Sequence, residues 1–525
     1  MRVRLAGGQG PQTVSRRSIC ARLLIGSALI ALTSCAPGSG TGSSGSSSIP
    51  PERVLSAGFI DLDEVYINKI DLGDLAVTSM TSLREIDSRI TVERKDGSLT
   101  VGLAGAGSAS YPVPAADDAG AWGRLTGAAV SNLKGQSASL GAADVESLYE
   151  TMFDAMVHSL DPFSRYASRE EARENRASRD GFGGIGVRID VVDEGVKVLS
   201  VMEETPAEAS GLRANDIIQT IDGESAQKLD QRDVIQRLRG PIGSVVTLGI
   251  QRGGQPLVIE VKRAHIVPQT VSGELDGNIA VIRLSGFNHS TTEVLKDKIE
   301  LLDSGLPGGL QGLVIDLRGN PGGLLDQSVA VSDLFLTSGK IVTTHGRHPD
   351  SHQYFNAGAE EIVPGVPIVL LIDGHSASAS EIVAAALQDQ GRAVVVGSAS
   401  YGKGTVQTVL SLPNDGELTL TWARFHAPSG YPLHKRGVMP DICTSGSGNE
   451  DAVLRKLRRG QLPLSQALRQ STVDDADDGA VTSFRANCPA VETESALDLE
   501  IALALIRDKQ LYARASGLQA AEATP

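Results

Sequence analysis

Two uninterrupted apolar runs constrain the fold of this chain more than any other feature. They are GLVIDLRG at residues 312–319 and PIVLLIDG at residues 367–374. A strand that lacks alternating polar positions is buried on both faces, which is typical of a parallel sheet with helices on either side. Strand-like and helix-like stretches alternate along this part of the chain. We therefore predict an α/β fold with a parallel sheet for this region.

The rest of the chain divides where its composition and periodicity change. A mainly helical N-terminal region contains a predicted hairpin around Asp96-Gly97. Short strands and many glycines follow, and the chain after the α/β body is polar with one amphipathic helix. The predicted segments are a signal peptide at 1–35, a Gly/Ser tether at 36–54, the helical region at 55–180, a β-rich module at 181–265, the α/β body at 266–442 and a C-terminal extension at 443–525.

The first 35 residues indicate export. Arg16-Arg17 precede the apolar stretch LLIGSALIALTSC, which is too short to span a bilayer. Its end, Leu32 to Cys35, resembles a bacterial lipobox, whose cysteine is lipidated, and an ordinary signal peptide that contains a cysteine is the alternative. The flexible tether that follows favours the anchor. Ala36 indicates, by the same resemblance, an anchor on the periplasmic face of the outer membrane.

The cysteines bear on the expected disulfide, and the net charge bears on the class of binding partner. The chain has four cysteines: Cys20 lies inside the signal and Cys35 is the lipid site, which leaves Cys443 and Cys488. In an oxidising compartment we expect these two to form a disulfide, and two separate buried thiols are the alternative. A net charge of −15 argues against a nucleic-acid partner, which would need a basic face.

Three separated turn sequences carry the candidate chemistry. NPGG at 320–323 follows the first apolar run, GHSASASE at 374–381 follows the second, and YGKGTVQTV lies at 401–409. Turns at the ends of neighbouring parallel strands meet at one edge of a sheet, so Gly323 and Ser378 are expected to be close. Ser378 also starts an S-x-x-E pattern, a capping box that explains the serine without any catalysis.

A nucleophilic serine needs a base and an oxyanion hole. No histidine is marked out by a nearby acid, whereas Lys403 lies between two glycines, where burial would lower its pKa from ~10.4 toward ~7–8. Gln407, on the same face of the predicted strand, could orient the amine without adding charge. The backbone N–H groups of Gly323 and Ala379 would bind the oxyanion. We expect a Ser–Lys dyad of Ser378 and Lys403.

The β-rich module resembles a PDZ domain. The residues that carry the resemblance are Gly184-Ile185-Gly186-Val187 at a strand start and PAEASGLRANDIIQTIDG at 206–223. In that arrangement consecutive backbone N–H groups bind a terminal carboxylate, while a free strand edge pairs with an extended peptide. The resemblance implies that this module holds a protein chain by its C-terminal end.

The stretch from residue 144 to residue 442 resembles the carboxyl-terminal processing proteases. Besides the three turns, SLDPFSRY at 159–166, ALQDQGRA at 386–393 and the segment 420–442 carry the resemblance. These enzymes are serine endopeptidases with a PDZ domain inserted before a crotonase- or ClpP-like core. The resemblance implies that the chain uses the dyad described above, needs no cofactor, and cleaves unfolded or flexible proteins near their C-terminal tails.

Two other functions fit parts of the sequence. A non-catalytic scaffold would use only the PDZ-like module, and an acyl-CoA hydratase or isomerase would use the oxyanion amides without a nucleophile. The histidines of HGRHPDSH at 345–352 are better explained by a polar loop than by a metal site, so no metal site is predicted. The sequence leaves open an activating adaptor and a homo-oligomer.

Overall fold

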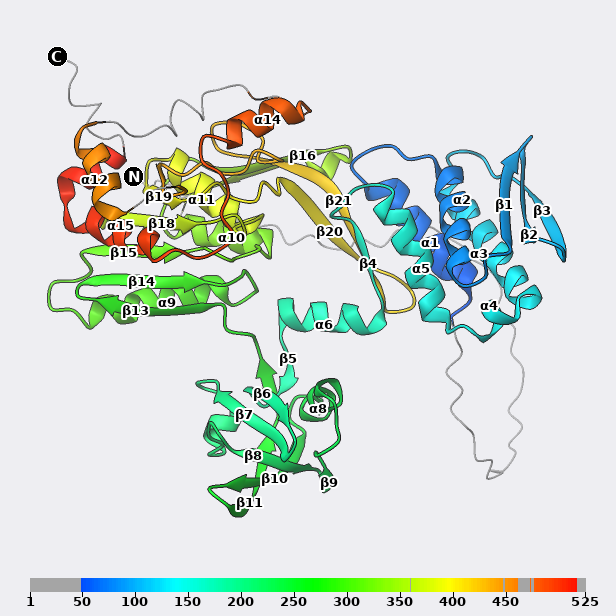
Figure 1. The fold of residues 1–525 in the computed structure, drawn as a ribbon, viewed down its shortest axis with the longest axis horizontal. Helices are drawn as coiled ribbons and strands as arrows, with labels where there is room; N and C mark the ends of the chain where they lie inside the picture. The colour runs from blue at the N-terminus through cyan, green and yellow to red at the C-terminus, as the bar shows by residue number, and fades with distance from the viewer. Residues whose placement is uncertain (1–48, 359, 447–448, 461–472, 474–475, 517–525) are drawn as a thin grey trace, which may run out of the picture. The chain divides into compact units, whose positions relative to one another are not determined.

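The structure is a computed structural model that describes residues 49–358, 360–446, 449–460, 473 and 476–516 (Figure 1). No helix within these ranges is both long enough and apolar enough to cross a membrane. The predicted signal peptide and its candidate lipid site, Cys35, lie outside the described residues.

The N-terminal region packs helices against one another and against a small antiparallel sheet. The hairpin predicted around Asp96-Gly97 is present, and a third strand extends it in the order β1-β2-β3. Helices α1 and α3 approach closely, since a Cβ on Gly123 would stand 2.4 Å from the Cα of Ser56. The elements are α1 (Pro51–Val65), α2 (Leu72–Ser82), η1 (Leu83–Glu85), β1 (Ile90–Lys95), β2 (Ser98–Leu103), β3 (Gly107–Pro112), α3 (Ala119–Gln136), α4 (Ala138–Ala142) and α5 (Val145–His158).

The PDZ-like residues form a sheet of their own. Its strand order is β11-β10-β8-β7-β6, with β9 paired to β8, so β6 lies at one edge. Strands β5 and β12 pair at the point where the chain enters and leaves this part. The elements are β5 (Phe182–Gly184), β6 (Val187–Val192), β7 (Gly195–Val201), α7 (Pro206–Ala209), β8 (Ile217–Ile221), β9 (Glu224–Ser225), α8 (Gln231–Leu238), β10 (Val245–Arg252), β11 (Gln255–Lys262) and β12 (Ala264–Ile266).

The two apolar runs form β15 and β18, which are neighbouring parallel strands in the sheet β13-β14-β15-β18-β19-β22. Only the β13–β14 pair of this sheet is antiparallel among the described strands. The turns after β15 and β18 therefore leave the same edge of the sheet. The elements are β13 (Val271–Asp276), β14 (Ile279–Leu284), α9 (Thr291–Ser304), β15 (Gly312–Asp316), α10 (Leu325–Asp333), β18 (Ile368–Ile372), α11 (Ala379–Asp389), β19 (Ala393–Gly397) and β22 (Ile442–Cys443).

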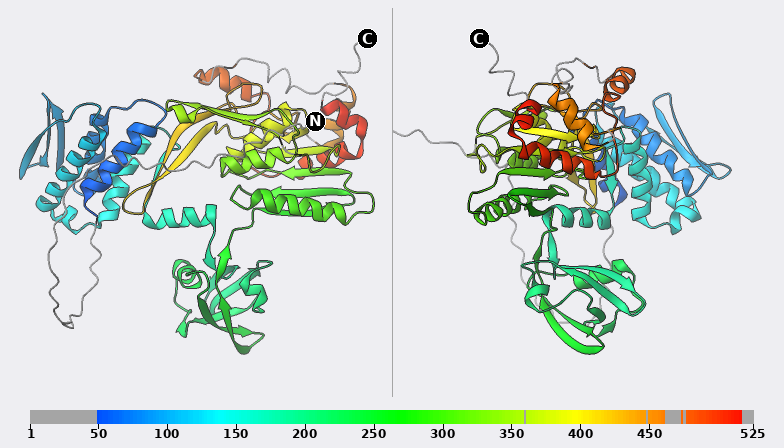
Figure 2. Two further views of the ribbon diagram at one scale, coloured as in Figure 1. Left: turned by 180° about the vertical axis from the view of Figure 1, so that it is seen from behind. Right: turned by 60° about the vertical axis from the view of Figure 1, so that its left-hand side comes forward.

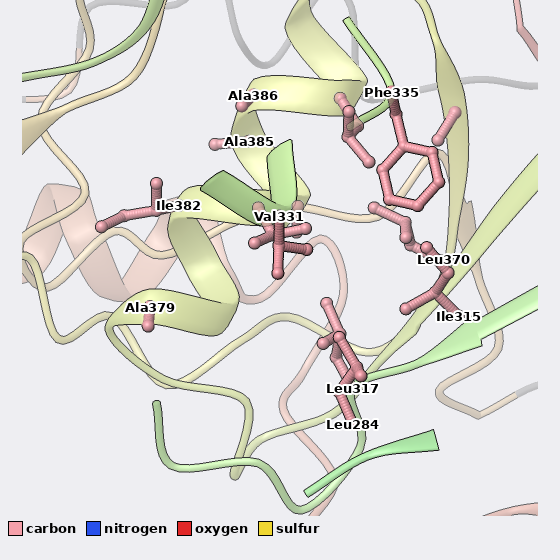
Figure 3. Close-up of a cluster of buried hydrophobic side chains, with 14 of the residues drawn as sticks. Leu284, Ile315, Leu317, Val331, Phe335, Leu370, Ala379, Ile382, Ala385 and Ala386 are labelled. Atoms are coloured by element: carbon pink, nitrogen blue, oxygen red, sulfur yellow. The ribbon is translucent and has the colours of Figure 1, made fainter. Parts of the chain in front are cut away.

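Helices cover this sheet on both faces. On one face α11 and α10 pack onto side chains such as Leu317 and Leu370 (Figure 3). On the other face the C-terminal extension supplies the cover, and its helices α12, α15 and α16, at the end of the chain's colour range, lie against the sheet in Figure 2. Ile506 packs so tightly that a Cβ on Gly312 would stand 2.1 Å from its Cγ2. These helices are α12 (Glu450–Arg458), α15 (Ala496–Arg507) and α16 (Lys509–Ala515), while α14 (Asp478–Arg485) packs through Phe484 in a separate cluster with Ala399 and Met439.

A second sheet, in the order β17-β16-β21-β20, carries the loop with Lys403 at the start of β20. Strand β4, which comes from SLDPFSRY, pairs with β21 of this sheet and so brings Arg165 beside it. Helix α6 follows β4 and leads to the PDZ-like part. The elements are β4 (Arg165–Ala167), α6 (Arg169–Asp180), β16 (Lys340–Gly346), η2 (Pro349–Ser351), β17 (Gln353–Asn356), β20 (Thr405–Ser411) and β21 (Glu417–His426).

Candidate active site

Ser378 stands in the turn between β18 and α11, at the N-cap of the helix. Its φ is +55° and its ψ is −113°, a backbone conformation that residues with a side chain rarely adopt. Strained residues of this kind concentrate at functional sites, and a strained strand-to-helix turn can expose a nucleophile. The capping box predicted from S-x-x-E is also formed. Ser378 thus caps the helix and at the same time lines a cavity.

Glu381 ties the serine turn to the lysine loop. Its buried Oε2 accepts the backbone N–H groups of Ser378, at 2.8 Å, and Lys403, at 2.9 Å. Its Oε1 accepts the N–H of Gly402, at 2.7 Å, and the hydroxyl of Ser400. Burial raises the pKa of the Glu381 carboxyl, and these hydrogen bonds oppose the shift because they favour the ionised form. One carboxylate therefore fixes the spacing of the two backbones that carry the predicted dyad.

The glycine turn at 320–323 lies directly against the serine turn. A Cβ on Gly322 would stand 2.9 Å from the Cβ of Ser378 and 3.0 Å from the nitrogen of Ala379, and Gly322 has a φ of +102°. Neither the N–H of Gly323 nor that of Ala379 donates a hydrogen bond to another described residue. Both amides are therefore free to bind an oxyanion.

The electrostatic surroundings of Lys403 favour a neutral amine. Burial lowers the pKa of Lys403, and the positive charge of Arg165 lowers it further. The negative charges of Glu381 and Asp161 act in the opposite direction but do not cancel the shift. A lysine with a lowered pKa can accept a proton near neutral pH, as a general base must.

The side chains of the predicted dyad are not hydrogen-bonded to each other in this structure. The amine of Lys403 lies over the ring of Phe163, 5.4 Å from its centroid, and makes no hydrogen bond to the hydroxyl of Ser378. The amide of Gln407 donates to the hydroxyl of Thr405, at 2.8 Å, and to a second threonine hydroxyl, instead of contacting the amine. The amine must therefore approach the hydroxyl before proton transfer, and catalytic contacts often tighten only with substrate bound.

One cavity of about 440 Å³ brings together all the residues predicted for the dyad and the oxyanion hole. Ser378, Ala379, Gly323, Lys403 and Gln407 line it. Sequence reasoning missed two parts of this cavity: the wall from β4 and α6, and the role of the capping glutamate as a link to the lysine loop. The residues of that wall are Arg165, Asn175, Ser178 and Arg179.

A second groove lies in the PDZ-like part. It has a volume of about 340 Å³ and is lined by the predicted peptide-binding residues Gly184, Ile185, Gly186 and Val187. Helix α8 forms the facing wall with apolar side chains such as Ile235. The groove therefore follows the β6 edge, where an extended peptide could add as a further strand.

The remaining candidate residues lie apart from both grooves. Cys443 and Cys488 are joined in a disulfide. The Nδ1 atoms of His345 and His352 are 3.3 Å apart, but no group of three or more metal-binding side chains within the described part of the chain is placed to hold a metal ion.

Comparisons with known proteins agree with this arrangement. Residues 278–444 match the model of peptidase family S41, and residues 183–262 match that of the PDZ domain. The carboxy-terminal-processing protease of Bartonella bacilliformis is 41% identical over 303 residues, which are 57% of this chain and 70% of that protein. A solved structure of a photosystem II D1 C-terminal processing protease is 24% identical and covers 75% of this chain and 93% of its own, with a TM-score of 0.37. The chain belongs to peptidase family S41 and is a serine peptidase with a PDZ domain.

Proposed function

We propose that this peptidase cleaves proteins near their C-terminal ends, with Ser378 as the nucleophile and Lys403 as the general base. The observation that carries the assignment is the single cavity shared by the serine, the partly buried lysine and the two free amides of Gly323 and Ala379. Glu381 supports it, because this carboxylate binds the backbones of both dyad residues.

The proposed reaction proceeds through an acyl-enzyme. The neutral amine of Lys403 takes the proton of the Ser378 hydroxyl as its oxygen attacks the peptide carbonyl carbon, and the amides of Gly323 and Ala379 bind the resulting oxyanion. The C–N bond then breaks as the lysine returns the proton to the leaving amine. Water, deprotonated by the same lysine, hydrolyses the ester and releases the shortened chain.

Tail recognition is proposed for the PDZ groove. The terminal carboxylate would bind the backbone N–H groups of the loop at 184–187, and the tail would add to the edge of β6. The apolar wall around Ile185, Ile235 and Leu238 suits an apolar terminal side chain. Unfolded or flexible tails fit best, because a strand can be added only from an extended chain.

Replacing the nucleophile tests the proposal. Ser378→Ala should reduce kcat for an internally quenched peptide with an apolar C-terminus by at least about a thousandfold, while the Kd for the peptide stays unchanged. Ser380→Ala is the matched control two residues away, because the Ser380 hydroxyl only donates to the carbonyl of Asn320. Cleavage that survives Ser378→Ala would eliminate the assigned dyad and leave the PDZ groove as a tail-binding scaffold.

A lipid anchor at Cys35 and a periplasmic site at the outer membrane also remain part of our proposal. The apolar leader, the Gly/Ser stretch after it and a disulfide-forming cysteine pair support it. Cys35→Ser should move the protein from the membrane fraction to the soluble fraction, and an unchanged distribution would contradict it. An activating adaptor and a homo-oligomer are further proposals, which co-purification and light scattering test.

A further inference from the structure

The two grooves are lined by positive charges although the chain as a whole carries a net charge of −15. The catalytic cavity has the guanidinium groups of Arg165 and Arg179 in its wall, beside the neutral amine proposed for Lys403, and no Asp or Glu. The PDZ groove has Arg188 and Arg239 in its wall and again no Asp or Glu. An acidic protein that keeps acidic side chains out of both binding grooves presents a local potential that attracts anionic peptides.

Arg165 lines the catalytic cavity with a guanidinium that has no acidic partner among the described residues. Its side chain forms no ion pair with another residue that the structure describes, and it is exposed. The two acids whose charges reach Lys403 already have donors: Glu381 is buried among its own, and Asp161 accepts the N–H groups of Phe163, at 2.7 Å, and Ser164, at 2.9 Å. The guanidinium of Arg165 is therefore available to a carboxylate on the substrate.

Helix α6 places one further guanidinium in the cavity wall, that of Arg179. Arg176 and Arg179 both bind the buried carboxylate of Glu417, at 2.8 Å and 3.0 Å. Two guanidinium groups thus share this single carboxylate. Because Glu417 lies behind the wall and its side chain is only 2% exposed, it cannot itself repel a substrate carboxylate at close range.

In the PDZ groove the two arginines stand at different places. Arg188 projects from β6 and is exposed, with no hydrogen bond or ion pair to another described residue. Arg239 follows α8 and lies over the ring of Phe182, 4.0 Å from its centroid. Stacking on this ring fixes the guanidinium of Arg239 beside the groove. Little side-chain entropy is therefore lost when the guanidinium binds a carboxylate there.

We propose that this peptidase prefers tails with acidic side chains, one read by Arg165 beside the scissile bond and one read by Arg188 and Arg239 near the C-terminal end. This inference rests on the proposed function. The substrate class is therefore an unfolded protein segment with carboxylates upstream of an apolar terminal residue. Arg188 and Arg239 act only on binding, whereas Arg165 also lowers the pKa of Lys403, so its part in selection is read from the ratio between matched peptides.

Matched peptides test the part of the proposal that concerns Arg165. A series with one apolar C-terminus carries Glu, Gln or Lys at each position around the scissile bond. For wild-type enzyme at low salt, one position should show a kcat/KM about fivefold higher with Glu than with Gln, and lower still with Lys. The Glu preference should shrink as salt is added, because the carboxylate is partly exposed. In Arg165→Gln the Glu/Gln ratio should fall to about one.

A second variant provides the control, and a binding assay tests the PDZ groove. Arg455→Gln removes one exposed arginine on α12 and should keep the wild-type Glu/Gln ratio. In the Ser378→Ala background, fluorescence anisotropy should show weaker binding of a Glu-containing tail after Arg188→Gln, with the Gln-containing tail unchanged. A wild-type ratio of one, or a ratio that Arg165→Gln leaves intact, would overturn the inference at the scissile bond. Failure of the proposed function is distinct, because Ser378→Ala would then cleave every peptide of the series.

Discussion

Glu381→Gln is the substitution that most directly probes how the site is held together. The side chain keeps its size, but one acceptor oxygen becomes an NH₂ donor in a pocket where every partner donates. The amide nitrogen will turn toward Ser400, because that hydroxyl can rotate to accept, whereas a backbone N–H cannot. The N–H of Gly402 then loses its buried acceptor.

The size of the effect follows from these contacts. An unpaired buried N–H costs about 1–3 kcal/mol, and each remaining bond that loses its charged acceptor weakens by about 1 kcal/mol. We expect Glu381→Gln to lower the free energy of unfolding by about 3–5 kcal/mol, which corresponds to a melting temperature lower by about 3–5 °C for a unit of this size. The spacing of Ser378 and Lys403 should loosen as well, so kcat should fall by about 10- to 100-fold with KM little changed.

Differential scanning calorimetry and steady-state kinetics on the same preparations provide the measurement. Glu300→Gln is the control, because Glu300 is 57% exposed and only pairs with Lys296 at the surface of α9. It should change the free energy of unfolding by less than about 0.5 kcal/mol. If Glu381→Gln melts and turns over like the wild type, the carboxylate does not set the geometry of the dyad and our account of the site is wrong.

Three further predictions follow from other contacts. Gly322→Ala should reduce kcat by at least about tenfold, because its Cβ would meet Ser378 and Ala379 at a φ of +102°; a wild-type kcat would contradict the close packing of the two turns. The pH–rate profile should show kcat rising with pH through a pKa below 10.5, because the unprotonated amine of Lys403 is the active form. Arg165→Gln should raise this pKa and Asp161→Asn should lower it, because each variant removes a charge that acts on the amine. Shifts in the reverse directions would exclude Lys403 as the base. Reducing Cys443–Cys488, which closes a loop with a sequence separation of 45, should destabilise the protein by about 4 kcal/mol, measured as a lower melting temperature with reductant and checked against a Cys443→Ser/Cys488→Ser double variant.

The sequence predicts the centre of this site well because the centre depends on local pattern. Continuous apolar runs specify β15 and β18, and neighbouring parallel strands must release their turns at one edge, which places Gly323 beside Ser378. The capping box is equally local, since Ser378 and Glu381 are only three positions apart. Such features need no knowledge of distant pairings.

The surroundings of the site depend on pairings between distant segments, which periodicity does not encode. Strand β4 pairs with β21 across about 250 residues, and this pairing places Arg165 beside the sheet that carries the lysine loop. Lys403 precedes the first residue of β20, Thr405, so strand alternation does not fix the direction of its side chain, and the contact expected with Gln407 is not formed. The hydrogen bond from the backbone N–H of Lys403 to Glu381 likewise joins helix α11 to the lysine loop, and only the tertiary fold brings these two segments together.

The C-terminal extension also has a consequence for where this enzyme can be shortened. The extension covers the sheet through Ile506. It also contacts the segment just before the general base Lys403, because the guanidinium of Arg485 donates to the carbonyl oxygens of Ser400, at 2.7 Å, and Arg436, at 3.0 Å. A protein truncated at residue 444, where the match to the peptidase family ends, would expose the apolar face of the sheet to solvent. It would also lose the hydrogen bonds from Arg485 that hold the segment carrying Lys403. The shortest fragment that folds into an active protease is therefore longer than the segment that matches the family. It must include the C-terminal helices, because they support the sheet and the loop that carries Lys403.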